Sequence, residues 1–473
     1  MGYKRGDVIM ENKPWAYIVN DDYRDKCCHY CFTSEIADDP LFPSKTNKLQ
    51  RCSGCRFAYF CNASCLKFAW KDHKFECQRI KKLQETNTPL PTAQVRLAAR
   101  VFNKYFRGDI MDPACRPTSN RTFLTLWHHA DKVRESVGQL AAYKKVMGEV
   151  RQFIGNENVP VSDDDELLPI YNRITVNSIN MDDGEVQKGI GVFLGASMFD
   201  HSCRPNADFF IRDHGATIYI VALDDVPDIS SVRLRYGDVF EPTWKRREYL
   251  EKTYFFTCDC ELCQDTKRDN LYRAVCCSNC RGPVPLSVTF KSTGPCSRCK
   301  TILTADILKQ AKQLSSEIPQ MLTQSERLLS NQSRLDGEVK RVNFVALRNV
   351  YNKSIKNVLH PWNWVYVKFV QHIMDYYILL EGEEDVELRA QWFMECVEAY
   401  RRFDVMSPTL GVRLVVVAEF LALHERSDEA KRYFDEAESI VLMFFGKEHS
   451  LYQRMSMSRS VMEQFEVVKA LRL

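Results

Sequence analysis

The spacing of apolar residues predicts that the last third of the chain is helical. Apolar residues at steps of three and four, which share one face of a helix, recur in four segments beyond Thr304. These segments are Ile307-Ala311-Leu314-Ile318, Trp364-Val367-Val370-Met374-Tyr377, Leu388-Trp392-Cys396-Tyr400 and Ala430-Phe434-Ala437-Val441. We expect successive helices that stack on one another. Such stacks commonly form concave peptide-binding surfaces, although packing alone explains the pattern equally well.

Alternation of apolar and polar residues predicts short strands in the middle of the chain. Residues 208–211 and 217–222 alternate in this way, and the run Val232-Arg233-Leu234-Arg235-Tyr236 follows them. Upstream, residues 81–152 carry helix-length apolar spacing, interrupted between Gly108 and Ser119. The expected fold class is therefore α+β, with a β-rich core followed by an all-α, TPR-like region.

Length and charge indicate a multidomain protein without a strong overall field. A chain of 473 residues suggests about two to four domains, and the formal net charge is +3. The opening Met1-Gly2-Tyr3-Lys4-Arg5-Gly6 lacks the apolar core of a signal peptide, and no apolar run is long enough to span a bilayer. We therefore expect no membrane association, and we expect a monomer.

The cysteines carry the candidate chemistry, and the densest group lies between Cys28 and Cys77. Its ligands form four short-spaced pairs: Cys28-x2-Cys31, Cys52-x2-Cys55, Cys61-x3-Cys65 and His73-x3-Cys77. Such spacing lets both members of a pair bind one ion, and eight ligands complete two tetrahedral zinc sites. A disulfide-stapled secreted module is the alternative, but zinc-type pairs favour a reducing compartment.

Basic residues accumulate around the same segment. Between Lys45 and Lys82 there are ten Lys or Arg residues against Asp72 and Glu76. A patch of this charge would suit DNA phosphates or an acidic partner. A solvated face explains it equally well, so both interpretations stay open.

A third cysteine set lies at Cys258-x-Cys260-x2-Cys263 and supplies only three ligands. A structural zinc ion needs a fourth, and Cys203 is the natural candidate. Pinning Cys203 to this set would fix the turn at residues 200–206 against the aromatic residues that lie later in the chain.

A fourth set consists of Cys277-x2-Cys280 and Cys296-x2-Cys299. Two such pairs fifteen residues apart have the spacing of a small zinc ribbon, with Cys276 as a competing ligand. Fifteen cysteines and His73 then form four sets of four, so the sequence predicts four zinc ions per chain.

Together these motifs resemble the SMYD family, in which a SET lysine methyltransferase domain is split by an inserted MYND finger and followed by a helical domain. The run from Cys28 to Cys77 matches the MYND finger. The family's Asn-His-Ser-Cys-x-Pro-Asn motif is matched by residues 200–206, with Asp in place of the first Asn, and Tyr236 matches the SET tyrosine. Residues 258–263 match the post-SET cysteines, and residues 446–451 resemble a short motif of the helical domain.

The family pattern also implies how the chain is divided and how the finger binds its metal. It places Cys28, Cys31, Cys61 and Cys65 on one zinc ion, and Cys52, Cys55, His73 and Cys77 on the other. The implied parts are an N-terminal SET portion (1–27), the MYND finger (28–77), a helical SET insert (78–165), the SET core (166–255), the post-SET region (256–271), a zinc-ribbon-like insert (272–303) and the helical domain (304–473).

The resemblance implies methyl transfer from S-adenosylmethionine to a lysine ε-amine of a histone or another protein. A lysine amine in water has a pKa of about 10.4 and must be neutral to attack, which an aromatic-lined channel favours. Tyr236 beside the transferred methyl and Tyr254 lining the lysine channel are the expected catalytic residues, although aromatic residues at strand ends are also common in cores. The expected cofactor contacts, with Phe256 packed on the adenine, are Asn177, Ser197, Asp200, His201, Tyr236 and Phe256.

Two departures from the family pattern bear on activity. Asp200 places a negative charge where the motif has an amide donor. SET domains also begin with a Gly-x-Gly loop, and none precedes residues 4–9, which resemble the turn and strand that follow that loop. We therefore expect weakened cofactor binding. A scaffold with little or no catalysis stays open as the alternative; it would bind partners in chromatin and transcriptional regulation, including Pro-rich peptides through the MYND finger. Either protein is expected in the nucleus and the cytoplasm.

Overall fold

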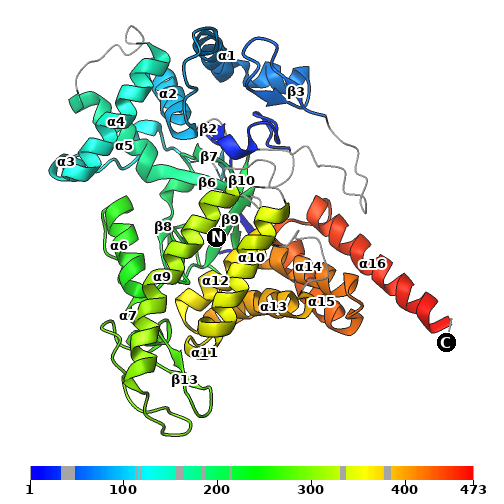
Figure 1. The fold of residues 1–473 in the computed structure, drawn as a ribbon. Helices are drawn as coiled ribbons and strands as arrows, with labels where there is room; N and C mark the ends of the chain where they lie inside the picture. Colours follow the sequence, from blue (N-terminus) through cyan, green and yellow to red (C-terminus); the bar gives the residue numbers. More distant parts are fainter. Residues whose placement is uncertain are drawn as a thin grey trace.

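The computed structural model describes residues 2–33, 48–111, 115–117, 119–155, 164–182, 187–211, 216–330, 337–377 and 385–471. Small sheets and the helices that cover them form the first part of the chain, and a long run of helices forms the second (Figure 1). The predicted α+β fold class is thus confirmed. Within these described ranges, no helix has both the length and the apolar character needed to cross a bilayer. The residue boundaries between domains remain predictions.

A four-stranded antiparallel sheet lies at the centre of the first part. Its strand order is β5-β1-β10-β9, with β1 at Val8–Asn12, β5 at Cys115–Arg116, β9 at Ala207–Ile211 and β10 at Ile218–Ala222. The two strands predicted at residues 208–211 and 217–222 are therefore confirmed, each to within one residue. Their buried apolar side chains pack into one core with those of β1.

A second sheet has the order β2-β7-β6, with β2 at Ala16–Val19, β6 at Ser178–Asp182 and β7 at Gln187–Val192. Gly189 makes this pairing close, because a Cβ atom there would lie 2.3 Å from the Ile18 carbonyl oxygen. Two-residue strands form three further pairs, which are β3 (Gln50–Arg51) with β4 (Tyr59–Phe60), β8 (Asp200–His201) with β11 (Arg233–Leu234), and β12 (Val275–Cys276) with β13 (Pro283–Val284).

Helices cover these sheets on one side of the molecule (Figure 1). They are α1 (Ala63–Glu85), α2 (Ala93–Phe106), α3 (Ala130–Glu135), α4 (Val137–Ile154) and α5 (Asp164–Asn177). Helical spacing was expected only from residue 81 onward, whereas α1 begins inside the cysteine run. The Asn62 side chain caps α1 by accepting a hydrogen bond from the Cys65 backbone N–H at 3.0 Å, which fixes the start of the helix at a metal ligand.

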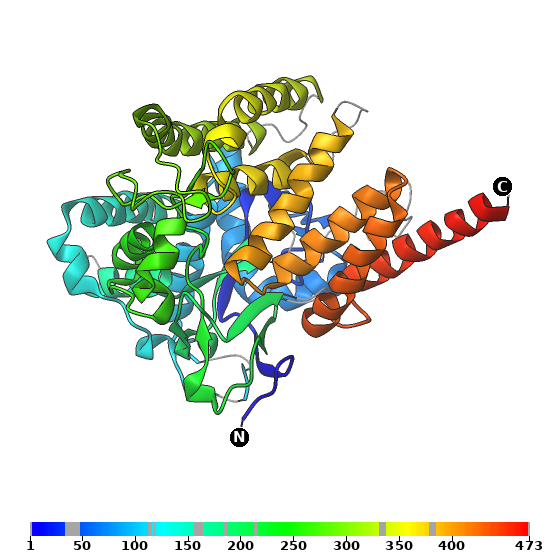
Figure 2. The ribbon, with the colours of Figure 1, turned by 90° about the horizontal axis from the view of Figure 1, so that it is seen from below.

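The remaining helices follow the central strands. They are α6 (Thr243–Tyr254), α7 (Glu261–Gln264), α8 (Thr266–Leu271), α9 (Ala305–Ser330), α10 (Gly337–Val350), α11 (Lys356–Val358), α12 (Trp364–Tyr377), α13 (Val386–Phe403), α14 (Pro408–Leu423), α15 (Ser427–Phe444) and α16 (Ser450–Leu471). Helix α14 packs against α13, α15 and α16. The last helix extends away from the body of the molecule (Figure 2).

The helical faces predicted from apolar spacing point into the core of the second part. On α15, Ala430, Phe434, Ala437 and Val441 are all buried. The first residue of two other faces is only half-buried, namely Ile307 on α9 and Leu388 on α13. Cys396 is buried on α13, as expected of a core residue, and the side chain of Tyr377 lies outside the described part.

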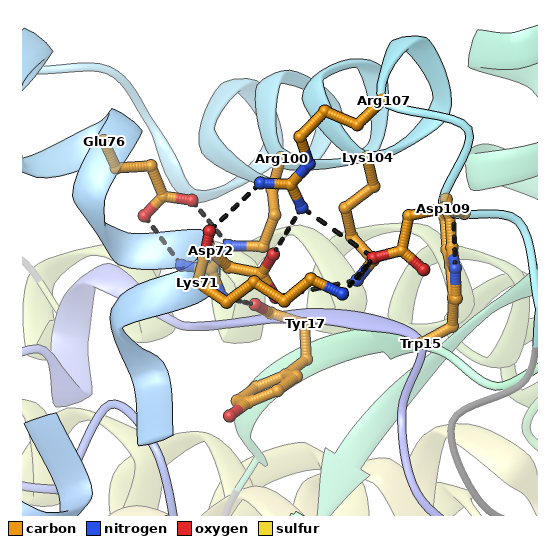
Figure 3. Close-up of polar contacts among 9 residues, drawn as sticks. All are labelled: Trp15, Tyr17, Lys71, Asp72, Glu76, Arg100, Lys104, Arg107 and Asp109. Carbon is orange, nitrogen blue, oxygen red and sulfur yellow. Dashed lines mark hydrogen bonds and ion pairs between the residues drawn. The ribbon is translucent and has the colours of Figure 1, made fainter. Parts of the chain in front are cut away.

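A buried ion pair joins α1 to α2 beneath the finger. Arg100 donates from Nε to Glu76 Oε1 at 2.5 Å and from NH2 to Oε2 at 2.7 Å, and both side chains are less than a tenth exposed. Arg100 also donates to the backbone oxygen of Tyr17 on β2 (Figure 3). Burial by itself lowers the pKa of Arg100, but the charge of Glu76 more than offsets this and raises it, so Arg100 stays charged.

Charges of alternating sign continue from this pair toward the surface (Figure 3). Lys71 and Lys104 lie 2.9 Å and 3.0 Å from the Asp109 carboxylate, and Arg107 lies 3.0 Å from Asp72. Lys71 belongs to the basic patch noted in the sequence; its side chain is 70% exposed, and its ammonium is paired with Asp109. Lys45, at the start of that patch, lies outside the described residues.

We expect Arg100→Met to destabilise the protein by about 3–5 kcal/mol, because Glu76 would be left charged, buried and unpaired. Differential scanning calorimetry should show the midpoint falling by several degrees for the transition that contains the finger. Arg134→Met is the matched control, because its partners Asp131 and Asp165 are exposed and such pairs contribute about 0–1 kcal/mol. An equal, small effect of both substitutions would show that the buried pair does not anchor the finger.

Candidate active site and metal centres

The four predicted cysteine sets each come together in space. The ligand atoms of each set lie within 4.8 Å of one another. The sets are Cys28/Cys31/Cys61/Cys65, Cys52/Cys55/His73/Cys77, Cys203/Cys258/Cys260/Cys263 and Cys277/Cys280/Cys296/Cys299. Both finger sets follow the interleaved assignment that the family pattern implied. All nineteen cysteines lie in described parts of the chain, and all are free of disulfides.

The sulfur spacing suits zinc. Zinc–sulfur bonds of about 2.3 Å in a tetrahedron place neighbouring sulfurs about 3.8 Å apart. The Sγ atoms of Cys52 and Cys77 lie 3.8 Å apart, and those of Cys203 and Cys258 lie 4.0 Å apart. In the ribbon, Cys280 and Cys296 are separated by 3.5 Å. The four tetrads are therefore consistent with zinc sites.

Local structure explains how each finger ligand is presented. Cys65, His73 and Cys77 lie on α1, where His73 and Cys77 are four residues apart and so share a helix face. Gly54 is required beside them, since a Cβ atom at this position would lie 2.9 Å from the Cys77 sulfur. In the ribbon, Cys277 is the ligand, whereas the sulfur of the competing Cys276 is directed toward the Leu359 carbonyl oxygen at 3.4 Å.

The set at Cys203 joins two distant segments of the chain. Cys203 follows β8, whereas Cys258, Cys260 and Cys263 surround the start of α7. Arg246 of α6 is buried beside them and donates to the Cys263 sulfur at 3.5 Å. Burial by itself would lower the pKa of Arg246, but the Cys203 and Cys263 sulfurs raise it, which fits a cation that balances a thiolate cluster.

Hydrogen bonds between β8 and β11 place the predicted catalytic tyrosine beside this cluster. The Asn206 side chain donates to the Ser231 oxygen at 2.9 Å and accepts from the Arg233 backbone N–H at 2.7 Å. The Tyr236 backbone N–H donates to Nδ1 of His201 at 3.0 Å. The segment that carries Tyr236 is therefore held at both ends by the turn at residues 200–206.

Aromatic side chains gather around Tyr236. Its ring centroid lies 4.7 Å from that of Tyr254 and 5.2 Å from that of His201, and His201 lies 5.9 Å from Phe256. The Tyr236 hydroxyl donates to the Phe199 carbonyl oxygen. Burial raises the pKa of Tyr236 to about 12 and lowers that of His201 to about 4, so at neutral pH the phenol keeps its proton and the imidazole is uncharged.

The other predicted cofactor residues lie on neighbouring elements. Asn177, at the end of α5, donates to the Trp127 carbonyl oxygen at 2.8 Å. The Ser197 hydroxyl donates to the Phe193 oxygen at 2.7 Å, and the Ser197 carbonyl accepts from Arg121 at 2.8 Å. Asp200 is exposed. Ser197 and Asn177 are thus fixed by backbone groups rather than by direct contact with the aromatic cluster.

Sequence reasoning missed several residues of this region. Arg121 is half-buried, and burial lowers its pKa, while the negative charge of Asp200 acts in the opposite direction. Arg121 therefore offsets part of the negative charge that Asp200 introduces. Neither Arg121 nor Arg246 belongs to a recognisable motif, so only tertiary placement reveals them.

A cavity of about 460 Å³ has Tyr236 in its lining. Its walls come from both parts of the chain and include Asp208 on β9, Asp238 and Lys368 on α12. The Lys368 ammonium lies 2.6 Å from Asp238 and 3.6 Å from Glu241, which joins the helical region to the segment that follows Tyr236. Lys368 was also absent from the sequence prediction.

Residues 28–77 match the MYND finger family. The chain is 26% identical over 268 residues to histone-lysine N-methyltransferase ASHR1 of Arabidopsis thaliana, which covers 56% of this chain and 51% of that protein. The human N-lysine methyltransferase SMYD2 is 26% identical over 268 residues, or 56% and 57% of the two chains. The mouse histone-lysine N-methyltransferase SMYD3 is 26% identical over 459 residues, or 95% and 90%. The chain thus spans about half the length of the first two relatives and most of the third.

Proposed function

Because the chain belongs to the SMYD family of SET- and MYND-domain proteins, we propose that it transfers a methyl group from S-adenosylmethionine to the ε-amine of a lysine in a histone or another protein. The observation that carries the proposal is the aromatic cluster around Tyr236, which the cysteine set at Cys203 holds in place. The relatives are themselves named as histone-lysine or N-lysine methyltransferases.

The residues around Tyr236 fit this cofactor in charge and shape. When bound, S-adenosylmethionine supplies an electrophilic methyl group on a positively charged sulfur. The rings of Tyr236, Tyr254 and Phe256 offer π faces, which attract cations. His201, neutral at pH 7 because of burial, adds no competing positive charge. Asp200, the first residue of the motif, lacks the amide donor of the family pattern, but its negative charge would attract the positive sulfur.

The two tyrosines suit the task of positioning an amine. Their ring centroids lie 4.7 Å apart, and both rings are partly buried. A lysine side chain that approaches these rings from solvent therefore loses bound water. Loss of water disfavours the ammonium form and so favours the nucleophilic amine. The Tyr236 hydroxyl is fixed by the Phe199 carbonyl, which limits its motion before the substrate arrives. Most of the rate gain then comes from orientation.

Tyr236→Phe should abolish methyl transfer while leaving zinc content and melting temperature nearly unchanged. The substitution removes the hydroxyl that Phe199 orients but keeps the ring that packs on His201 and Tyr254. Transfer of a labelled methyl group to a histone mixture measures the effect. A variant that unfolds or loses zinc would instead identify Tyr236 as a core residue.

We further propose that each cysteine tetrad binds one zinc ion in a structural role. The sulfur spacing supports this, since all four ligands of each set are protein side chains and leave no open position. Untagged protein should therefore contain four zinc ions per chain by elemental analysis. Cys296→Ser should lower the ratio to about three without affecting the finger. A ratio of three zinc ions per chain in the unsubstituted protein would contradict the zinc assignment in the ribbon. A ratio of two or fewer would contradict the zinc assignment at the Cys203 set as well.

A second candidate function, that of a scaffold, is favoured by the surface of the finger. On α1, Phe68 is 65% exposed and stacks on Tyr30 with ring centroids 5.5 Å apart, and Trp70 is 42% exposed. Exposed aromatic residues of this kind suit Pro-rich peptides.

The cysteines are free thiols rather than disulfides, which favours a reducing compartment. We propose that this compartment is the nucleus and the cytoplasm.

Phe68→Ser should weaken binding of a Pro-rich peptide about tenfold or more in fluorescence anisotropy, while methyl transfer to a free lysine peptide is unchanged. The exposed Val137→Ser on α4 serves as the matched control, since it lies away from the finger. Equal binding by both variants would show that the finger does not use this aromatic surface.

A further inference from the structure

Two stretches of the chain contain basic residues but no carboxylate. Residues 270–305, which include the ribbon, hold five Lys or Arg residues and no Asp or Glu, and residues 339–374 hold six and none. Over the whole chain the two signs are nearly balanced, with 65 basic and 62 acidic residues. The lack of carboxylates is therefore a property of these two stretches and does not follow from the overall composition.

The fold brings the two stretches together at one junction. Val275 of β12 forms an antiparallel bridge with Leu359, and the Arg281 guanidinium donates to the carbonyl oxygen of Lys356. Figure 1 shows β13 of the ribbon and the neighbouring α11 at the opposite end of the molecule from α1. This region, which we call the ribbon junction, is thus separate from the basic patch on the finger.

Six basic side chains of the ribbon junction are exposed, and none of them forms an ion pair with a residue in the described part of the chain. They are Arg281, Lys291, Arg298, Lys300, Lys353 and Lys356. Three other bases of the two stretches do form ion pairs, each with a carboxylate outside the stretches: Arg273 with Asp269, Arg348 with Asp385 and Lys368 with Asp238. No described side chain therefore neutralises the six exposed charges.

The two Cys-x2-Cys turns of the ribbon each present a base in the same place. The residue after the second cysteine is Arg281 in one turn and Lys300 in the other, with φ of 60° and 61°. This left-handed conformation favours glycine, yet both positions carry a long basic side chain. Arg298 lies beside the first turn, because a Cβ atom on Gly282 would be 2.9 Å from its Cδ atom. Like charges gathered in this way repel one another, and a bound anion relieves the repulsion.

The positive charges of the ribbon also act on the second stretch. Burial, followed by the charges of Arg402, Arg298 and Arg281, lowers the pKa of His360 to about 4. Bases from separate segments thus lie around one imidazole. A zinc ion held by four thiolates would contribute a charge of about −2, which leaves about +4 over the six exposed bases. The ribbon junction therefore stays positive when its metal is bound.

We propose that the ribbon junction binds the phosphate backbone of a double-stranded nucleic acid. Arg and Lys side chains form charge-assisted hydrogen bonds with phosphate oxygens, and a regularly charged backbone can engage several of them at once. No aromatic side chain of the two stretches is exposed. Single strands that stack their bases, and protein partners that use aromatic anchors, would therefore find no matching surface here. This activity goes beyond the proposed methyl transfer and does not depend on it.

The test uses the full-length chain and a labelled DNA duplex of about 20 base pairs in fluorescence anisotropy. A plot of log K against log salt should have a slope of about −4, because each of four to five phosphate contacts contributes about −0.9. Lys291→Gln/Arg298→Gln/Lys353→Gln should weaken binding about 10- to 100-fold at low salt and make the slope shallower by about 3.

Two further variants locate the site. Lys144→Gln/Lys145→Gln/Lys431→Gln removes the same charge from exposed positions on α4 and α15 and should bind like the unsubstituted protein. Equal weakening by this control would show that only net charge matters and would overturn the inference. Loss of binding in Lys67→Gln/Lys74→Gln, with none in the ribbon variant, would assign the duplex to the finger instead.

Other probes identify the ligand. An RNA duplex of the same length shows which double-stranded nucleic acid binds more tightly, and either result supports backbone recognition if the ribbon variant loses it. Tighter binding of polyglutamate than of both duplexes would identify an acidic protein as the ligand and contradict the inference, as would no binding of any probe. Zinc content and melting temperature establish that each variant is folded. If the triple variant loses zinc, Lys353→Gln alone, which lies outside the ribbon, should still weaken duplex binding.

Discussion

The meeting of Cys203 with Cys258, Cys260 and Cys263 is the constraint on which the candidate site depends. Cys203 precedes Cys258 by 55 residues, and Tyr236 and α6 lie between them. Closing a loop of this length costs conformational entropy, which four ligands on one centre offset. Once the loop is closed, the pairing of β8 with β11 places Tyr236 on His201, and the end of α6 delivers Tyr254 and Phe256 to the same place. Without this closure, the segment around His201 and the segment around Phe256 would not be held against each other.

The helical region and the strands both contribute to the walls of the cavity that Tyr236 lines. Lys368 reaches from α12 to Asp238 and Glu241, so one wall of the cavity beside Tyr236 comes from helices that hold no predicted catalytic residue. The ribbon reinforces this junction, because the Asn363 amide donates to the Ala274 carbonyl oxygen and Arg281 donates to the Lys356 carbonyl oxygen. The lining of this cavity is thus shared between parts of the chain with different sequence signatures.

The parts that could be predicted from sequence are those whose signal is local. Cysteines separated by two or three residues can bind one ion whatever the fold, and apolar residues at steps of three and four identify helices such as α15. Alternation in residues 232–236 predicted a strand there, and the structure forms only the two-residue β11 within that run. Its partner β8 (Asp200–His201) has no alternating pattern, so the pairing of the two strands was not foreseen. Arg100 and Lys368 form their ion pairs with residues from distant segments, so these pairs exist only in the folded chain. In the sequence, neither residue differs from an ordinary surface Lys or Arg. Helix α1 was partly missed because metal ligands, not an apolar stripe, occupy its first turns.

Helix α1 has a geometric consequence for any partner captured at the surface. It carries three metal ligands and Phe68, and its later residues Glu76 and Ile80 are buried against the body. A continuous helix of 23 residues is about 35 Å long and does not bend at a hinge. Because α1 joins the finger to the body without a break, the finger lies at a fixed distance from Tyr236 and is not connected by a flexible linker. If the chain has the proposed methyltransferase activity, a protein held there would offer its lysines at a set distance from Tyr236, and only lysines on a segment of matching span would gain effective concentration at that residue.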